Sequence, residues 1–135
     1  RQEVDRRAVR QALQVLQAGE VVLVAPEGTR HPRLQEAREG VAFLARRTDA
    51  PIIPVAVEGT IGFPTLRGSR RWRGPGVSVR FGRGFRFRPA RHGEKDDLQR
   101  MTQEAMYVLA GMLEPHRRGF YSDLERGTTA TLEFL

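Results

Sequence analysis

The sequence predicts an α/β fold in which a mostly parallel central sheet is flanked by helices. Two short apolar runs rich in β-branched residues, at 21–25 and 51–57, are typical of strands that are buried on both faces. Between them, apolar residues recur at helical spacing over about 35–48. A strand, a helix and a strand in this order indicate a βαβ unit, whose helix crosses over a parallel sheet.

A helix is also predicted ahead of the first run, over residues 5–18. Its apolar residues lie on one face, Asp5 is a candidate N-cap, and Gly19 follows its end. Within the helix expected at 35–48, Gly40 either allows close packing or marks a break. These two helices supply the cover that the faces of a parallel sheet need.

Downstream, two further strands and one helix are predicted. Residues 77–81 and 85–87 alternate between apolar and other side chains and are separated by glycines. A helical stripe over 98–112 stops before Pro115, and residues 116–135 follow as a tail without a predicted element. The apolar side chains of the first of these strands share one face, which we expect in the core: Val77, Val79 and Phe81.

The composition is that of one soluble globular domain. The chain has 135 residues, of which 39% are hydrophobic and 29% are charged, which excludes disordered, collagen-like and coiled-coil classes. It contains no cysteine, so disulfide bridges, thiolate nucleophiles and cysteine-based zinc sites are excluded. No apolar run approaches the ~20 residues of a membrane-spanning helix.

Positive charge is concentrated in one stretch. The net charge is +7, and residues 59–93 contain nine arginines and no acidic residue. Such a block is typical of a surface that binds a polyanion, either nucleic acid or anionic lipid. Aromatic residues are interleaved with these arginines, and Trp72 is the candidate for a membrane interface. The alternative is an ordinary solvated face in a chain rich in arginine.

The loop that follows the first apolar run carries the candidate chemistry. Ligands of parallel sheets bind at the carboxyl ends of the strands, where this loop is expected. Gly28 lets the backbone approach a ligand, Thr29 offers a hydroxyl, and Arg30 can grip a phosphate through two hydrogen bonds. Glu27 can orient that arginine or bind a hydroxyl. The purely structural alternative is an ordinary turn at the end of a strand.

Two blocks of the chain resemble a known family. Pro26-Glu27-Gly28-Thr29-Arg30 resembles the Phe-Pro-Glu-Gly-Thr-Arg signature of the glycerolipid acyltransferases, the lysophosphatidic acid acyltransferase (1-acylglycerol-3-phosphate O-acyltransferase) family. Residues 50–55, Ala-Pro-Ile-Ile-Pro-Val, are similar to the later Val-Pro-Ile-Ile-Pro-Val block of that family. The expected helix lies between the two blocks, and the resemblance covers about residues 1–90.

The resemblance implies a reaction and a set of binding residues. A fatty acyl group passes from an acyl thioester, carried by coenzyme A or acyl carrier protein, to lysophosphatidic acid or a related glycerol phosphate in phospholipid biosynthesis. The Glu27–Arg30 loop binds the acceptor, with Arg30 on the phosphate and Glu27 beside the glycerol. Arg1 stands at about the distance of a second phosphate-binding arginine, and its alternative is a frayed terminal residue. No bound cofactor and no metal are implied.

The family's general base is absent from its expected place. It belongs to a His-x4-Asp motif well upstream of the Glu-Gly-Thr-Arg loop, and no residue before Glu27 is histidine. Two pairs of residues that follow the start of that loop have the same spacing: His92 with Asp97, and His31 with Glu36. For His92 the alternative is a surface histidine before a helix whose dipole favours Asp96 or Asp97, and for His31 it is a loop histidine that touches ligand.

The remaining differences bear on specificity and on domain organisation. Ala25 and His31 replace the usual Phe and Ser around the signature, and His116 is interpreted as a helix-end residue. We expect no catalytic residue in this chain. Residues 1–115 are then the C-terminal part of an N-terminally truncated, glycerolipid acyltransferase-like domain, and residues 116–135 are a tail.

The expected partners follow from this interpretation. They are a lysophospholipid acceptor, an acyl thioester donor and an anionic membrane surface, which places the protein at the cytoplasmic face of the membrane, peripheral or anchored by a segment outside this chain. The alternative is a non-catalytic basic module that binds nucleic acid or anionic lipid. Nucleic acid is disfavoured, because the arginines fall in loops and strands and no known nucleic-acid motif is present.

Overall fold

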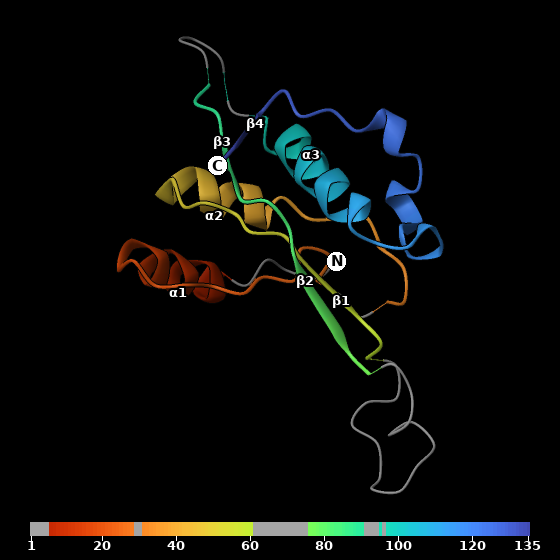
Figure 1. Ribbon diagram of the computed structural model, residues 1–135. Helices are drawn as coiled ribbons and strands as arrows, with labels where there is room; N and C mark the ends of the chain where they lie inside the picture. The colour runs from red at the N-terminus through yellow and green to blue at the C-terminus, as the bar shows by residue number, and fades with distance from the viewer. Residues whose placement is uncertain (1–5, 29–30, 61–75, 91–94, 96) are drawn as a thin grey trace, which may run out of the picture.

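The computed structural model describes residues 6–28, 31–60, 76–90, 95 and 97–135 (Figure 1). The predicted first and last helices are confirmed, but the middle helix begins only at Gly40, which therefore marks a break and not a close contact. None of the described helices combines the length and the apolar character that a membrane-spanning helix needs. The described α-helices are α1 (Arg6–Gln17), α2 (Gly40–Thr48) and α3 (Leu98–Gly111).

The described strands form two antiparallel pairs. β1 pairs with β2 so that Val55 faces Phe81, and β3 pairs with β4 so that Phe87 faces Leu132. An additional bridge joins Ile52 to Phe85, with N···O distances of 2.8 and 3.0 Å between their backbones. The strand bounds are Val55–Glu58 for β1, Ser78–Phe81 for β2, Phe85–Phe87 for β3 and Leu132–Phe134 for β4.

The predicted fold class, a mostly parallel central sheet flanked by helices, is wrong. Residues 21–25 form no strand, and no backbone hydrogen bond joins Val21–Val24 to another segment within the described residues. Val21 and Leu23 expose 92% and 91% of their surface. A central parallel strand needs a neighbouring strand on each side and cover on both faces, and here the second run pairs antiparallel with the strands that follow it in sequence.

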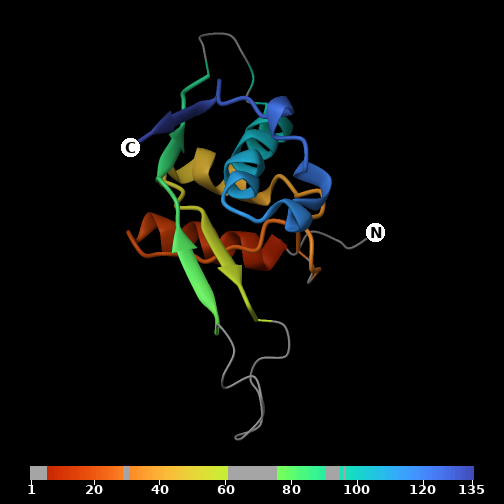
Figure 2. The ribbon, with the colours of Figure 1, turned by 45° about the vertical axis from the view of Figure 1, so that its right-hand side comes forward.

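The core is organised around α3 (Figures 1 and 2). One side of α3 packs on the turns that follow it and on β1, and the other side packs on α2, β3 and β4. The first buried cluster consists of Leu34, Ala56, Met106, Ala110, Leu113 and Tyr121. The second consists of Ala42, Ala45, Phe85, Phe87, Met101 and Leu132.

A buried carboxylate of α3 holds the tail against this core. Glu104 is 2% exposed and accepts hydrogen bonds from Thr131 N at 2.7 Å, from Thr131 Oγ1 at 2.6 Å and from the Thr128 hydroxyl. Arg100 Nε adds a contact at 3.3 Å. Burial raises the pKa of the Glu104 carboxyl, but these hydrogen bonds outweigh it and leave the pKa below its usual value. The tail is thereby ordered by a charge, as well as by the apolar Leu132.

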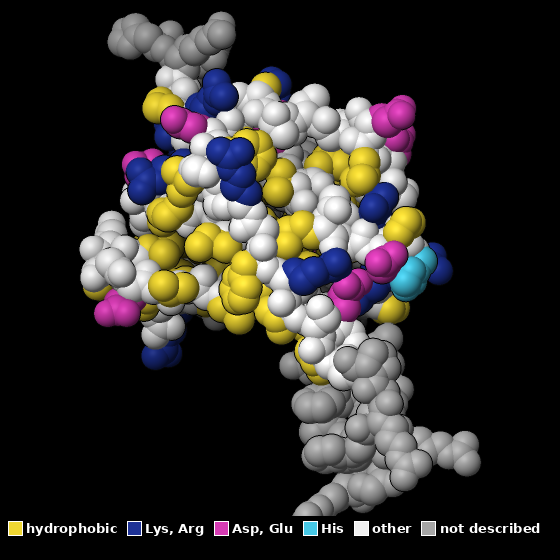
Figure 3. Space-filling model, in the orientation of Figure 1, with side chains coloured by type: hydrophobic (Ala, Val, Ile, Leu, Met, Phe, Trp, Pro, Cys, Tyr) yellow, Lys and Arg dark blue, Asp and Glu magenta, His cyan; other side chains and the backbone are white. Residues whose placement is uncertain are grey.

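The face of the β1–β2 pair that carries Val57, Val79 and Phe81 is open. These side chains are 41%, 51% and 73% exposed, and Val77 beside them is 39% exposed, so the core placement predicted for 77–81 is wrong. Figure 3 shows hydrophobic side chains gathered over the region between α1 and this strand pair. A two-stranded ribbon has only one face against α3, which leaves the other to solvent.

Candidate functional site

The candidate phosphate loop is a tight turn that is tied to the segment before α2. Gly28 N donates to Ala25 O at 3.1 Å and closes the turn, and Gly28 adopts a φ of +65°, a left-handed conformation that glycine tolerates best. Pro26 O accepts from Arg38 N at 3.0 Å. The turn is therefore held from the downstream side, by residues that precede α2.

The carboxylate of Glu27 is fixed by a backbone donor. Gln35 N donates to Glu27 Oε2 at 2.6 Å, a distance typical of a strong hydrogen bond to a charged acceptor. Glu27 is half-buried, while Gly28 beside it is exposed. One carboxylate oxygen is thus committed to the fold, and the other can accept a hydrogen bond from a substrate hydroxyl.

A guanidinium that the sequence motif does not include lies alongside the turn. A Cβ atom at Gly28 would lie 3.8 Å from Arg38 Nε and 4.0 Å from Arg38 Cζ, an ordinary van der Waals contact, so the guanidinium lies directly beside the turn. Arg38 has other interactions as well. An anion that approached the exposed Gly28 would lie close to this positive charge.

His31 is engaged by its own loop. Its Nδ1 lies 3.2 Å from Arg33 N and 2.9 Å from Gln35 Nε2, and both nitrogens carry protons to donate. Nδ1 also lies 3.1 Å from Arg33 O, a carbonyl that can only accept, so these contacts engage Nδ1 within the loop without fixing which ring nitrogen carries the proton. No hydrogen bond joins His31 to Glu36 among the described residues.

Several predicted site residues lie outside the described residues: Arg1, Thr29, Arg30 and His92. Asp97, the partner proposed for His92, is the N-cap of α3, where its Oδ1 accepts from Arg100 N at 2.9 Å. The Asp97 carboxylate thus lies at the N-terminus of α3, where the helix dipole was expected to favour it, and it also caps the helix. His116 is exposed within the 3-10 turn Pro115–Arg117. Within the described part of the chain, no His, Asp and Glu residues cluster closely enough to hold a metal ion.

The arginines of the basic stretch that the structure describes are bound within the chain. Arg80 Nη2 lies 2.6 Å from both Glu58 Oε2 and Met112 O, and Arg83 Nε donates to Leu135 O at 2.9 Å. Arg88 Nε donates to Leu132 O at 2.8 Å, and Arg86 pairs with Asp49 at 3.6 Å. These contacts join the four arginines of the strands and their connections to other parts of the chain. Trp72 and the other five arginines lie outside the described residues.

The sequence prediction missed Gln35 and Arg38 because it included them in the middle helix. Residues 34–38 are not helical, so the N–H groups of Gln35 and Arg38 are available to bond the turn at Glu27 and Pro26. The signal that could have found them was Gly40, whose low helix propensity favours a helix that begins there.

One family model matches part of the chain. Residues 1–58 match the model described as Acyltransferase, a stretch that includes the turn, Arg38 and α2. Neither the curated proteins nor the solved structures gave a significant match. The family match supports a general acyltransferase function for this part of the chain, and it leaves the acceptor and the pathway open.

Proposed function

We propose that this chain is the acceptor-binding part of a glycerolipid acyltransferase that transfers a fatty acyl group from an acyl thioester to lysophosphatidic acid or a related glycerol phosphate. The observation that carries the proposal is the fixed turn at 25–28, which lies in the part of the chain that matches the family and has the Arg38 guanidinium beside Gly28. A backbone without a side chain next to a guanidinium is a suitable environment for a phosphate.

In this proposal each residue of the turn has a separate role. Arg30 and Arg38 bind the acceptor phosphate, and Glu27, held by Gln35, positions the glycerol through a hydroxyl. The general base is a His-x4-Asp pair outside this chain. It takes the proton of the acceptor hydroxyl as the oxygen attacks the thioester carbonyl carbon, the carbon–sulfur bond breaks, and the thiol leaves with a proton.

The proposal includes the membrane as the source of the acceptor. Lysophosphatidic acid resides in a lipid surface, so a peripheral or anchored position at the cytoplasmic face would bring the turn to its substrate. Coenzyme A or acyl carrier protein would deliver the acyl group, in a step of phospholipid biosynthesis. The alternative of a basic module that binds nucleic acid is less well supported, because Arg80, Arg83 and Arg88 are used inside the chain.

The test is an acyl-transfer assay on the protein produced with its upstream coding sequence. Release of free thiol from acyl-coenzyme A or acyl carrier protein is measured with lysophosphatidic acid, with glycerol 3-phosphate and with an uncharged monoacylglycerol. We expect transfer to the phosphate-bearing acceptors only. Arg30→Gln and Arg38→Gln should each raise KM for the acceptor by about tenfold or more with little change in kcat, as expected for loss of a charge-assisted hydrogen bond.

The matched control is Arg126→Gln, which removes an exposed arginine far from the turn in sequence and should leave KM unchanged. An unaltered KM in Arg30→Gln and Arg38→Gln would refute the phosphate role of the turn. Absence of any acyl transfer, with salt-dependent binding to nucleic acid instead, would refute the acyltransferase proposal and support the basic module.

A further inference from the structure

The segment at 32–38, which holds the candidate turn, is itself bound to a later part of the chain. Leu34 N donates to Arg117 O, and Phe120 N donates to Leu34 O, each at an N···O distance of 2.9 Å. Arg117 Nε donates to Pro32 O at 3.3 Å, across 85 positions of the sequence. Because residues 34–38 are not helical, their backbone groups need partners from elsewhere, and residues 117–120 supply several of them.

The two backbones approach so closely at Gly119 that no side chain fits there. Gly119 begins the 3-10 turn Gly119–Tyr121 and has a φ of +49°. A Cβ atom at this position would lie 3.0 Å from Leu34 N and would overlap Leu34 O. The 3-10 turn therefore lies directly against the segment at 32–38, which brings the Tyr121 side chain next to that segment.

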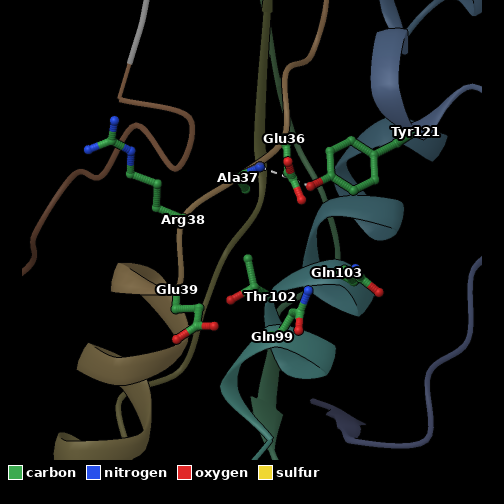
Figure 4. Close-up of a pocket in the computed structure, with 8 residues that line it drawn as sticks. All are labelled: Glu36, Ala37, Arg38, Glu39, Gln99, Thr102, Gln103 and Tyr121. Atoms are coloured by element: carbon green, nitrogen blue, oxygen red, sulfur yellow. Dashed lines mark hydrogen bonds between the residues drawn. The ribbon is translucent and has the colours of Figure 1, made fainter. Parts of the chain in front are cut away.

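Tyr121 binds the segment through its phenol oxygen. It is 1% exposed, and its oxygen accepts a hydrogen bond from Ala37 N at 3.0 Å (Figure 4). Its ring packs on the Tyr107 ring of α3 at a centroid distance of 5.2 Å. Burial raises the pKa of the Tyr121 phenol and, against the effect of the hydrogen bond, the charges of Glu36 and Glu27 raise it further. The phenol thus lies within electrostatic reach of the carboxylate of the candidate turn.

Ala37 lies between the two residues whose N–H groups hold the candidate turn. Gln35 N donates to the Glu27 carboxylate at 2.6 Å, and Arg38 N donates to a backbone carbonyl of the turn at 3.0 Å. Figure 4 shows the Arg38 side chain extending from the segment on the side opposite to Tyr121. The hydrogen bond at Ala37 therefore fixes the backbone between these two donors.

We propose that Tyr121 is a positioning residue for the acceptor, an inference that rests on the proposed function of the candidate turn. Its buried phenol oxygen holds the backbone at Ala37, which keeps the Glu27 carboxylate and the Arg38 guanidinium in place for the glycerol and the phosphate. Tyr121 lies outside the residues 1–58 that match the family model. The acceptor site thus extends into a part of the chain that the match does not cover.

The experiment is the acyl-transfer assay on the protein produced with its upstream coding sequence. Tyr121→Phe keeps the ring and removes the oxygen that accepts from Ala37. We expect its KM for lysophosphatidic acid to rise about threefold to tenfold, the range of one neutral hydrogen bond, while kcat and the KM for the acyl donor stay within about twofold. The matched control is Tyr107→Phe, which removes a phenol oxygen that has no hydrogen bond among the described residues and should leave all three constants unchanged.

Amide hydrogen exchange in the same protein measures the positioning directly. The N–H groups of Gln35 and Arg38 should exchange several times faster in Tyr121→Phe than in the unaltered protein, and at an unchanged rate in Tyr107→Phe. Glu104→Gln removes hydrogen bonds to the tail and none to the segment at 32–38, so it should lower stability without raising the KM for the acceptor.

The outcomes separate this inference from the proposed function. An unchanged acceptor KM in Tyr121→Phe, or an equal rise in Glu104→Gln, would overturn the role of Tyr121 and leave the proposed function standing. Absence of acyl transfer by the unaltered protein would refute the proposed function, and the role of Tyr121 with it.

Discussion

Two regions of the molecule, residues 6–28 and the segments packed on α3, differ in the fraction of their side chains that is buried. α1 contains no buried residue, and Leu23 in the run that follows is 91% exposed. By contrast, Phe85 and Leu132 on either side of the β3–β4 pair are 0% and 1% exposed. The family match covers the first region and reaches into the second, where it includes α2 and β1 but not α3, β3 or β4. The part of the chain that carries the candidate chemistry is therefore not the part that stabilises the fold, and its turn depends on bonds from Gln35 and Arg38.

The largest effect is expected in the second region, from Phe85→Ala. Phe85 contacts the rings of Phe87 and Phe134 at centroid distances of 6.0 and 5.9 Å, at the centre of the second cluster. Its removal should lower the free energy of unfolding by about 3–5 kcal/mol. The matched control is Phe81→Ala on the open face of β2, where the loss should be about 0.5 kcal/mol or less. Urea denaturation followed by circular dichroism measures both, and equal losses would contradict the difference in burial.

A smaller effect is expected from Glu104→Gln. The amide nitrogen cannot accept the hydrogen bonds that Thr128 and Thr131 now donate, so the free energy of unfolding at neutral pH should fall by about 1–3 kcal/mol. The exposed Glu133 of β4 provides the control, and Glu133→Gln should change stability by about 0.5 kcal/mol or less.

The same substitution predicts a pH dependence. Because the folded-state pKa of Glu104 lies below its ordinary value of 4.5, the unfolded chain binds more protons in the window beneath that value. The stability that the carboxylate contributes is complete above the ordinary pKa and is lost as the pH falls through the folded-state pKa. The difference between the unaltered chain and Glu104→Gln should therefore shrink in acid. A difference that stays constant from neutral pH into acid would argue against a charged Glu104.

The smallest effect is expected in the first region, from Leu23→Ala. A leucine in a buried strand would cost about 2–5 kcal/mol, but at 91% exposure we expect a change of about 0.5 kcal/mol or less. Leu132→Ala, at 1% exposure, is the matched control and should show the full cost. A large loss in Leu23→Ala would mean that the run at 21–25 is buried after all.

Local sequence patterns predicted most of the helices and strands, but they did not predict which strands pair with each other. The stripe that begins at Leu98 became α3, and 85–87 became β3 with both phenylalanines buried. The partner of β3 was not predictable, because β4 lies in a polar tail and is held by the buried Glu104, which has no hydrophobic signal. The apolar run at 21–25 predicted a central strand, but apolar character alone does not supply the neighbours that such a strand pairs with.

The candidate site was predictable only at the motif itself. Glu27 and Gly28 do form the turn expected after the first apolar run, although no strand precedes it. Leu34 and Ala37 pack into the core from a non-helical segment, and their spacing is the same as in a helix. The apolar spacing therefore could not distinguish a helix from this non-helical segment. For that reason the hydrogen bonds that Gln35 and Arg38 donate to the turn were not predicted.

The bonds of Glu104 to Thr128 and Thr131 span 24 and 27 residues, and they have a consequence for the order of folding. During synthesis a chain emerges from its N-terminus, so α3 is complete well before the threonines and the strand that cover it exist. Over that interval the Met101 face of the helix and the Phe85 ring lack the Leu132 side chain that later shields them. The nascent chain thus exposes this apolar surface near the end of its synthesis, before Leu132 covers it. In this interval a chaperone would protect the chain from aggregation.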